Sequence, residues 1–79
     1  MDFKGLCVVV RSHLMIPKAQ QAFPGALVLA PHGAKTGHRF ESIVFLEWHP
    51  ESETDHRWVD EGLKTGLGPG CNANVFYLP

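Results

Sequence analysis

The chain has 79 residues, of which 44% are hydrophobic and 19% charged, and its formal net charge is −1. This composition is typical of one small globular domain and excludes a disordered tail. A dedicated nucleic-acid-binding domain is normally basic, so direct binding of nucleic acid is not expected. The charge is nevertheless uneven, because five of the seven basic side chains lie in residues 1–39 and seven of the eight acids lie in residues 40–79.

The amino-terminal segment and the two cysteines bear on location and cofactors. The first apolar run ends at Arg11, well short of the roughly 20 residues that span a bilayer. With no targeting signal, we expect a cytoplasmic protein that does not enter a membrane. Cys7 and Cys71 are too few for a disulfide framework and lack metal-site spacing. Two reduced thiols are expected, with a bridge within or between chains as the alternative, and no cofactor is predicted.

The first half of the chain predicts a strand, a short helix and a second strand. Residues 4–11 favour a strand, because residues 8–10 are all valine and therefore β-branched and apolar on both faces. Pro17 suits the first turn of a short helix over residues 18–23, which a Pro-Gly pair ends. Residues 26–30 are apolar and predict the second strand.

The middle of the chain predicts a hairpin. A glycine-bearing turn over residues 31–37 leads into residues 38–50, HRFESIVFLEWHP, which form the longest predicted strand. Two strands joined by such a turn indicate an antiparallel pair. Alternation along the third strand places Val44 on one face and Ile43 and Phe45 on the other. Both faces of this strand are therefore apolar.

The acidic second half predicts a capped helix and a last strand. Ser52 and Asp55 have the spacing of a capping box, in which each side chain accepts a hydrogen bond from the other's backbone amide. Apolar residues recur at helical spacing as far as about Gly66. A Gly-Pro-Gly sequence over residues 68–70 ends the helix, and residues 71–78 are the last predicted strand.

The predicted order is β-α-β-β-α-β, in a single compact α+β domain over residues 1–79. This order is typical of the ferredoxin-like fold, in which two helices pack on one face of a four-stranded antiparallel sheet. If the short first helix is only a loop, the fold becomes a four-stranded sheet with one packed helix.

Helices on one face of a sheet leave its other face uncovered. The hydrophobic residues expected on that face are Val9, Ile43 and Phe45. Soluble monomers seldom expose such a patch, and where one exists it usually marks an interaction site. We therefore predict that this face pairs with a second copy, giving a homodimer, or with a partner protein.

The chain has no catalytic motif and no metal-binding motif. Its histidines are His13, His32, His38, His49 and His56. They lack the close pairs typical of metal sites, so scattered surface histidines are expected in preference to a metal ligand set or a catalytic base. The turn over residues 31–39 carries Lys35, His38 and Arg39 and can contact an anion, but it lacks the spacing of a phosphate-binding loop. A solvated loop is the expected structure.

The acids near the capped helix form a candidate partner-binding surface. They are Glu51, Glu53, Asp55, Asp60 and Glu61. One interpretation is a solvated helix whose acids favour the positive end of the helix dipole. The other is a negative surface that docks on a basic groove of another protein. Candidate aromatic anchors beside it are Trp48, Trp58, Phe76 and Tyr77.

The acidic segment HPESETDHRWVDEG (residues 49–62), the small α+β domain, the surplus apolar sheet surface and the lack of a catalytic motif together resemble the anti-CRISPR proteins. These are small phage-encoded inhibitors of bacterial defence. The resemblance covers the character of the whole chain and involves no shared motif. It implies a non-enzymatic inhibitor in the host cytoplasm, which binds a CRISPR effector complex and blocks target-DNA capture or nuclease recruitment. A net charge of −1 departs from the strongly acidic members that mimic DNA.

Two functional hypotheses follow. The first is a protein-binding inhibitor that occludes a functional site, such as a nucleic-acid-binding site, on a CRISPR effector or another host protein. The second is a small nucleic-acid-binding or RNA-cleaving toxin-like domain that uses a turn with His32, Lys35, His38 and Arg39. The near-neutral charge favours the first, because phosphate binding depends on clustered Lys and Arg side chains.

Overall fold

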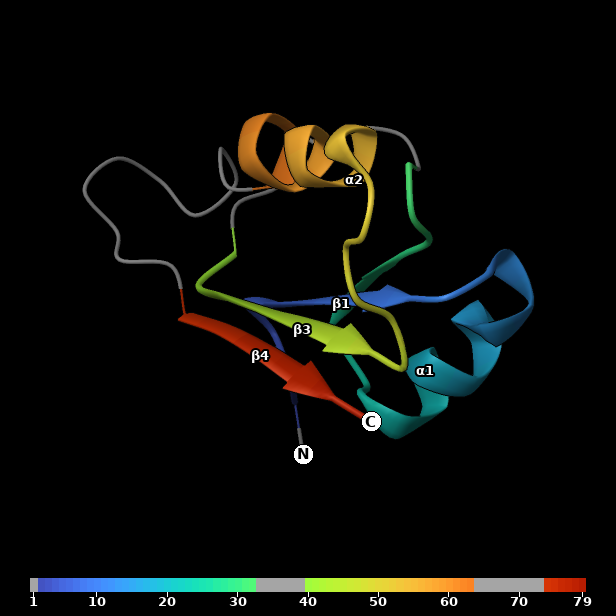
Figure 1. The fold of residues 1–79 in the computed structure, drawn as a ribbon. Coiled ribbons are helices and arrows are strands. Elements are labelled where there is room, and N and C mark those ends of the chain that lie inside the picture. Colours follow the sequence, from blue (N-terminus) through green and yellow to red (C-terminus); the bar gives the residue numbers. More distant parts are fainter. Residues whose placement is uncertain (1, 33–39, 64–73) are drawn as a thin grey trace.

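The computed structural model describes residues 2–32, 40–63 and 74–79 (Figure 1). Its strands are β1 (Leu6–Val10), β2 (Leu27–Leu29), β3 (Ser42–Leu46) and β4 (Asn74–Leu78). A short 3-10 helix, η1 (His13–Met15), leads into helix α1 (Ile16–Ala22), and helix α2 (Glu53–Arg57) continues as a π-helical segment, η2 (Trp58–Leu63). The predicted order β-α-β-β-α-β is confirmed. No helix in these described ranges is both long enough and apolar enough to cross a membrane.

The four strands form one sheet in the order β2-β1-β3-β4, and every neighbouring pair is parallel. Cys7 of β1 lies between Leu27 and Ile43, and Ile43 in turn pairs with Val75. The predicted antiparallel sheet, and with it the ferredoxin-like fold, is therefore wrong. The segment read as a hairpin turn does not join neighbouring strands, because β2 and β3 lie on opposite sides of β1.

The parallel sheet has a physical reason in the strand sequences. Parallel strands are covered on both faces and so have near-continuous apolar runs, without the alternation of a half-exposed strand. β1 has the sequence LCVVV and β3 the sequence SIVFL, and the interior of each is buried. The connection over residues 30–41 also fits, since a crossover between parallel strands needs about a dozen residues whereas a tight hairpin needs about two to five.

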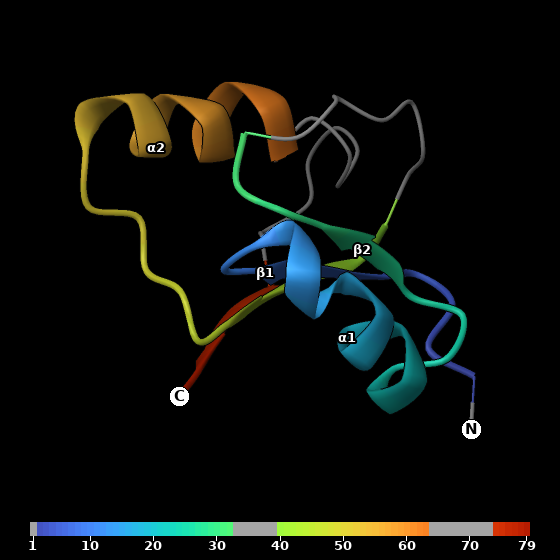
Figure 2. The same cartoon turned by 90° about the vertical axis from the view of Figure 1, so that its right-hand side faces the viewer.

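The two helices pack on opposite faces of the sheet (Figures 1 and 2). On one face Val8 and Val10 pack with Ala19 of α1. On the other face a larger cluster contains strand residues together with Val59 and Leu63 of η2. The prediction that both helices share one face is therefore wrong. The arrangement is a doubly wound sheet, in which the chain first covers one face and then the other.

The second helix also covers the residues predicted to form an exposed oligomer face. Val9, Ile43 and Phe45 are each 0% exposed and belong to the cluster beneath η2. They form core rather than a surface, so the predicted exposed patch at these three residues is wrong. Their pattern was that of strands buried on both sides.

Local signals predicted several element ends well. Pro17 lies in the first turn of α1, and Gly25, with φ +88°, follows the helix where the chain turns into β2. Both hydrogen bonds of the predicted capping box are present, with the Ser52 hydroxyl accepting from the Asp55 amide. The third strand is shorter than predicted, because Glu47 takes a left-handed conformation (φ +57°) that no strand continues through.

We expect Ser52→Ala to lower the free energy of unfolding by about 1 kcal/mol, because it leaves an amide of the first helical turn without its acceptor. Urea denaturation measures this change. Ser12→Ala is a matched control, since Ser12 precedes η1 but makes no side-chain capping bond. The control variant should stay within about 0.5 kcal/mol of the unaltered protein. Equal losses in the two variants would contradict a capping role for Ser52.

Candidate functional site at the carboxyl edge of the sheet

The sheet order places the expected binding region at one edge of the sheet. In doubly wound sheets, ligands bind outside the carboxyl ends of the strands, where the strand order reverses. Here the chain leaves β1 through α1 to reach β2 on one side, whereas β3 lies on the other side of β1. The reversal therefore falls between β1 and β3. Arg11 directly follows β1, and Glu47 directly follows β3.

A hollow of about 270 Å³ lies at this point. Its lining residues, here called the carboxyl-edge site, are Arg11, Glu47, Trp48, His49, Glu51 and Asp55. Three carboxyl groups and a single guanidinium give the lining a net negative charge when His49 is neutral. Within the described part of the chain, Arg11 makes no ion pair with these acids, so its guanidinium and the carboxylates of Glu47 and Glu51 remain open to a ligand.

Two strained backbone positions border the same edge. Among described residues other than glycine, only His32 (φ +59°) and Glu47 (φ +57°) have positive φ. His32 follows β2 and Glu47 follows β3. The Glu47 amide donates a 2.9 Å hydrogen bond to the Leu78 carbonyl oxygen, which holds the bend against the end of β4. Such conformations cost of order 1–3 kcal/mol each and concentrate at binding and catalytic sites.

His32 connects the end of β2 to the helix on the far side of the site. Its Nε2 atom hydrogen-bonds to the Asp55 carboxylate, and its ring lies 5.6 Å from the Trp58 ring. The His32 hydrogen bond is the main reason that the pKa of Asp55 lies below its ordinary value of 3.8. The backbone amides of Ser52 and Glu51 act in the same direction. Asp55 is therefore held as an anion in the lining of the hollow.

Aromatic side chains support the site from within the fold. The Trp48 ring lies 5.3 Å from that of Phe45 and 6.1 Å from that of Trp58, in an edge-to-face arrangement with Trp58. The His49 ring stacks on Tyr77 at 5.1 Å. Since Phe45 is fully buried, its contact holds Trp48 against the core. His49 is exposed and stacks on Tyr77, which in turn stacks on Phe45.

The structure separates the five acids that were predicted to form one surface. Glu51 and Asp55 line the carboxyl-edge site. Glu53 pairs with Arg57 at 3.6 Å on the exposed side of α2. Glu61 borders a different shallow hollow, which also involves His32 and Trp58, and Asp60 is exposed on η2.

Glu47 and Arg11 complete the site, and neither was among the residues predicted from the sequence. The feature of the sequence that indicates Arg11 and Glu47 is their position directly after an apolar strand. That feature becomes informative only once the two strands are known to run in the same direction.

The other predicted site residues fall in two groups. Lys35, His38 and Arg39 lie outside the described residues, as does Cys71. Cys7 is a free thiol, fully buried in β1, and burial raises its pKa to about 12. A thiol in that setting is neither a nucleophile nor accessible to a second chain. Within the described ranges, no three His, Cys, Asp or Glu side chains converge as metal ligands.

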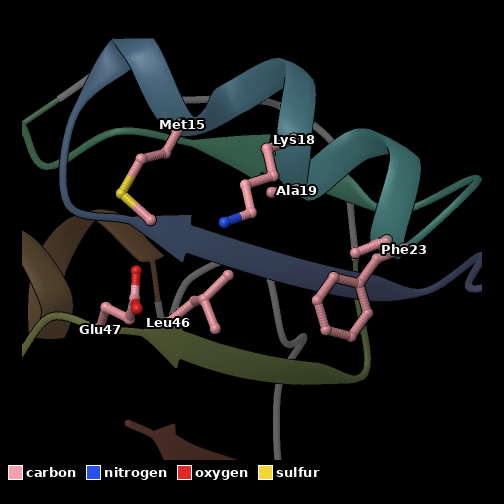
Figure 3. Close-up of a pocket in the computed structure, with 7 residues that line it drawn as sticks. Met15, Lys18, Ala19, Phe23, Leu46 and Glu47 are labelled. Atoms are coloured by element: carbon pink, nitrogen blue, oxygen red, sulfur yellow. The ribbon is translucent and has the colours of Figure 1, made fainter.

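Another hollow, of about 230 Å³, lies between α1 and the end of β3 (Figure 3). It is mainly apolar, with Met15, Phe23 and Leu46 among its lining. Figure 3 shows the Lys18 side chain reaching from α1 toward the strands. Glu47 lines this mainly apolar hollow as well as the mainly polar carboxyl-edge site.

Comparison of the chain with family models, curated proteins and solved structures finds no match in any of the three.

We expect His32→Asn to raise the pKa of Asp55 toward 3.8, because it removes the principal hydrogen bond to that carboxylate. Asparagine tolerates the positive φ of this position, so the backbone is retained. Carbon-detected NMR titration of the Asp55 carboxyl measures the change. His56→Ala, which removes an exposed imidazole from the same helix, is the control and should leave the Asp55 pKa unaltered.

The contribution of the His32–Asp55 interaction to the free energy of unfolding should depend on pH. A lowered carboxyl pKa adds stability above the unfolded pKa, and that stability is lost as the pH falls through the folded pKa. The difference in unfolding free energy between the unaltered protein and His32→Asn should therefore shrink on acidification below about pH 4. A gap that is constant from neutral to strongly acidic pH would contradict the His32–Asp55 interaction.

Cys7 should be unreactive while the protein is folded. In a Cys71→Ser variant, which isolates Cys7, a thiol-specific chromogenic reagent at neutral pH should label no cysteine until denaturant is added. The reasons are that the side chain is 0% exposed and that its high pKa leaves almost no thiolate. Full labelling of the folded variant at the rate of a free thiol would contradict this burial.

Proposed function

We propose that the protein is a non-enzymatic binding protein, which docks its carboxyl-edge site on a basic surface of a partner protein and occludes that surface. The observation that carries this proposal is that Glu47, Glu51 and Asp55 line one hollow together with Trp48 at the reversal point of the sheet, where they outnumber the one guanidinium, that of Arg11. Carboxylates beside an indole ring suit a lysine or arginine side chain, which gains ion pairing and a cation–π contact together.

The dimensions of the site favour a protein side chain over a small-molecule ligand. Pockets for drug-sized ligands usually measure about 300–1,000 Å³, and most of their lining is apolar. The hollow here measures about 270 Å³ and is lined mainly by charged and polar groups. An inserted basic side chain would fill it while the surrounding acids orient the docked surfaces.

The partner best suited to this surface is a nucleic-acid-binding protein, because such proteins present clustered Lys and Arg side chains to phosphate. The resemblance to anti-CRISPR proteins points to a guide-loaded CRISPR effector complex as the first partner to test. Complementary charge speeds the encounter and fixes orientation, and the aromatic residue adds affinity. In this proposal inhibition requires only that the basic groove be covered.

The nucleic-acid-binding alternative gains no support from the described residues. Of the four residues in its turn, only His32 is described, and its ring is engaged by Asp55 and Trp58. The net charge at the carboxyl edge is negative, which repels phosphate. A fluorescent single-stranded RNA should therefore show no saturable binding at physiological salt.

We expect the double variant Glu47→Lys/Glu51→Lys to bind a fluorescein-labelled arginine-rich peptide at least tenfold more weakly than the unaltered protein, as measured by fluorescence anisotropy. The matched control is Glu41→Lys/Glu53→Lys, which changes the net charge equally at exposed acids outside the hollow. That control should lose much less affinity. Equal losses in both pairs, or no peptide binding by the unaltered protein, would contradict a site at Glu47 and Glu51.

The same proteins test the proposed partner directly. Binding of labelled duplex DNA by a purified guide-loaded CRISPR effector is measured as each protein is added. The unaltered protein and the control pair should reduce DNA binding, and Glu47→Lys/Glu51→Lys should not. If the protein binds the peptide but does not reduce DNA binding by the effectors tested, the carboxyl-edge site is supported. Those effectors are then excluded as its partners.

A further inference from the structure

The outer edge of β4 is open in the described part of the fold. β4 is the last strand in the order β2-β1-β3-β4, so it pairs with β3 on one side only. The amide and carbonyl groups along its other side have no strand partner there. An edge of this kind is a template for pairing with a strand from another chain.

The same strand has exposed apolar side chains. Phe76 is 52% exposed, Tyr77 is 51% exposed and Leu78 is 38% exposed. The register explains why: α1 packs on β1 and β2, whereas Phe76 and Leu78 lie on the α1 side of β4, opposite Val44 and Leu46 of β3. No described element covers that part of the sheet.

The two edges of the sheet differ in how they are protected. Edge strands are usually kept from pairing by charges, by proline, by a bulge or by being very short. At the other edge, β2 has only three residues, Leu27–Leu29. β4 has the five residues NVFYL, with no charge and no proline, and it keeps regular register with β3 throughout.

From these observations we infer that two copies of the chain pair β4 with β4 in antiparallel orientation, about a two-fold axis at Phe76. The pairing joins the two four-stranded sheets into one continuous sheet. In this register Phe76 lies opposite Phe76 of the second copy, and Val75 lies opposite Tyr77. Pairs of aromatic residues, and of an aromatic with a β-branched residue, are among the favourable cross-strand pairs.

The absence of charge on β4 is what selects a second copy as the occupant. In this register the two-fold axis places Phe76 opposite its own equivalent and residue 75 opposite residue 77, so a charge at position 76, or like charges at positions 75 and 77, would repel across the axis. The sequence NVFYL has none. A partner protein that added a strand here would impose no such requirement. The inference is independent of the proposed function, since Phe76 lies outside the carboxyl-edge site.

A charge exchange at Phe76 tests this arrangement. The unaltered protein should have the mass of two chains by size-exclusion chromatography with light scattering. Phe76→Lys and Phe76→Asp should each be monomeric, because each places like charges beside the axis. An equimolar mixture of the two variants should regain the mass of two chains, and added salt should weaken this mixed dimer.

Leu14→Lys and Leu14→Asp are the matched controls, because Leu14 is 91% exposed and lies in η1, away from the sheet edge. Both should remain dimeric. The Phe76 variants should remain folded, because about half of this side chain is exposed and it is not part of the buried core. Circular dichroism and urea denaturation check that they are folded. A monomeric unaltered protein, dimeric Phe76 variants, or a mixture that stays monomeric would each overturn the inference.

Discussion

The structure depends on the burial of β1 on both of its faces. Cys7 and Val9 face one helix layer and Val8 and Val10 face the other, and all four are fully buried. A strand with no solvated face needs a neighbour on each side and a helix above and below, and the parallel crossover arrangement supplies both. Because β1 must be paired on both edges, β3 lies beside it. Arg11, at the end of β1, therefore lies at the reversal point of the sheet.

The sequence predicts correctly those features of the fold that depend on residues close together in the chain. The order of elements, the proline at the start of α1 and the Ser52–Asp55 capping box are each determined by neighbouring residues, and each is present. Strand direction is not local, because it depends on which side of β1 the chain returns to. The apolar runs in β1 and β3 do carry that information, because a run without alternation is typical of a strand buried on both faces, as both strands are.

The site was predicted only in part for the same reason. Glu51 and Asp55 lie in an acidic segment that is evident in the sequence. Arg11 and Glu47 are distant in sequence, and they meet only because β1 and β3 run side by side in one direction. Glu47 is also held at positive φ by the end of β4, which no reading of nearby residues reveals. A correct strand direction would have placed both residues at one edge.

The sheet order also has a kinetic consequence. Every strand pair joins segments far apart in the chain: Val8 pairs with Val28 and with Val44, and Val44 pairs with Phe76. Topologies dominated by such distant pairings close large loops before they gain contacts, and they fold in about milliseconds to seconds rather than microseconds. During synthesis, the backbone groups along the second edge of β1 therefore have no strand partner until β3 has been made. The core around β1 can therefore form only after β3 has been synthesised, however early the first helix forms.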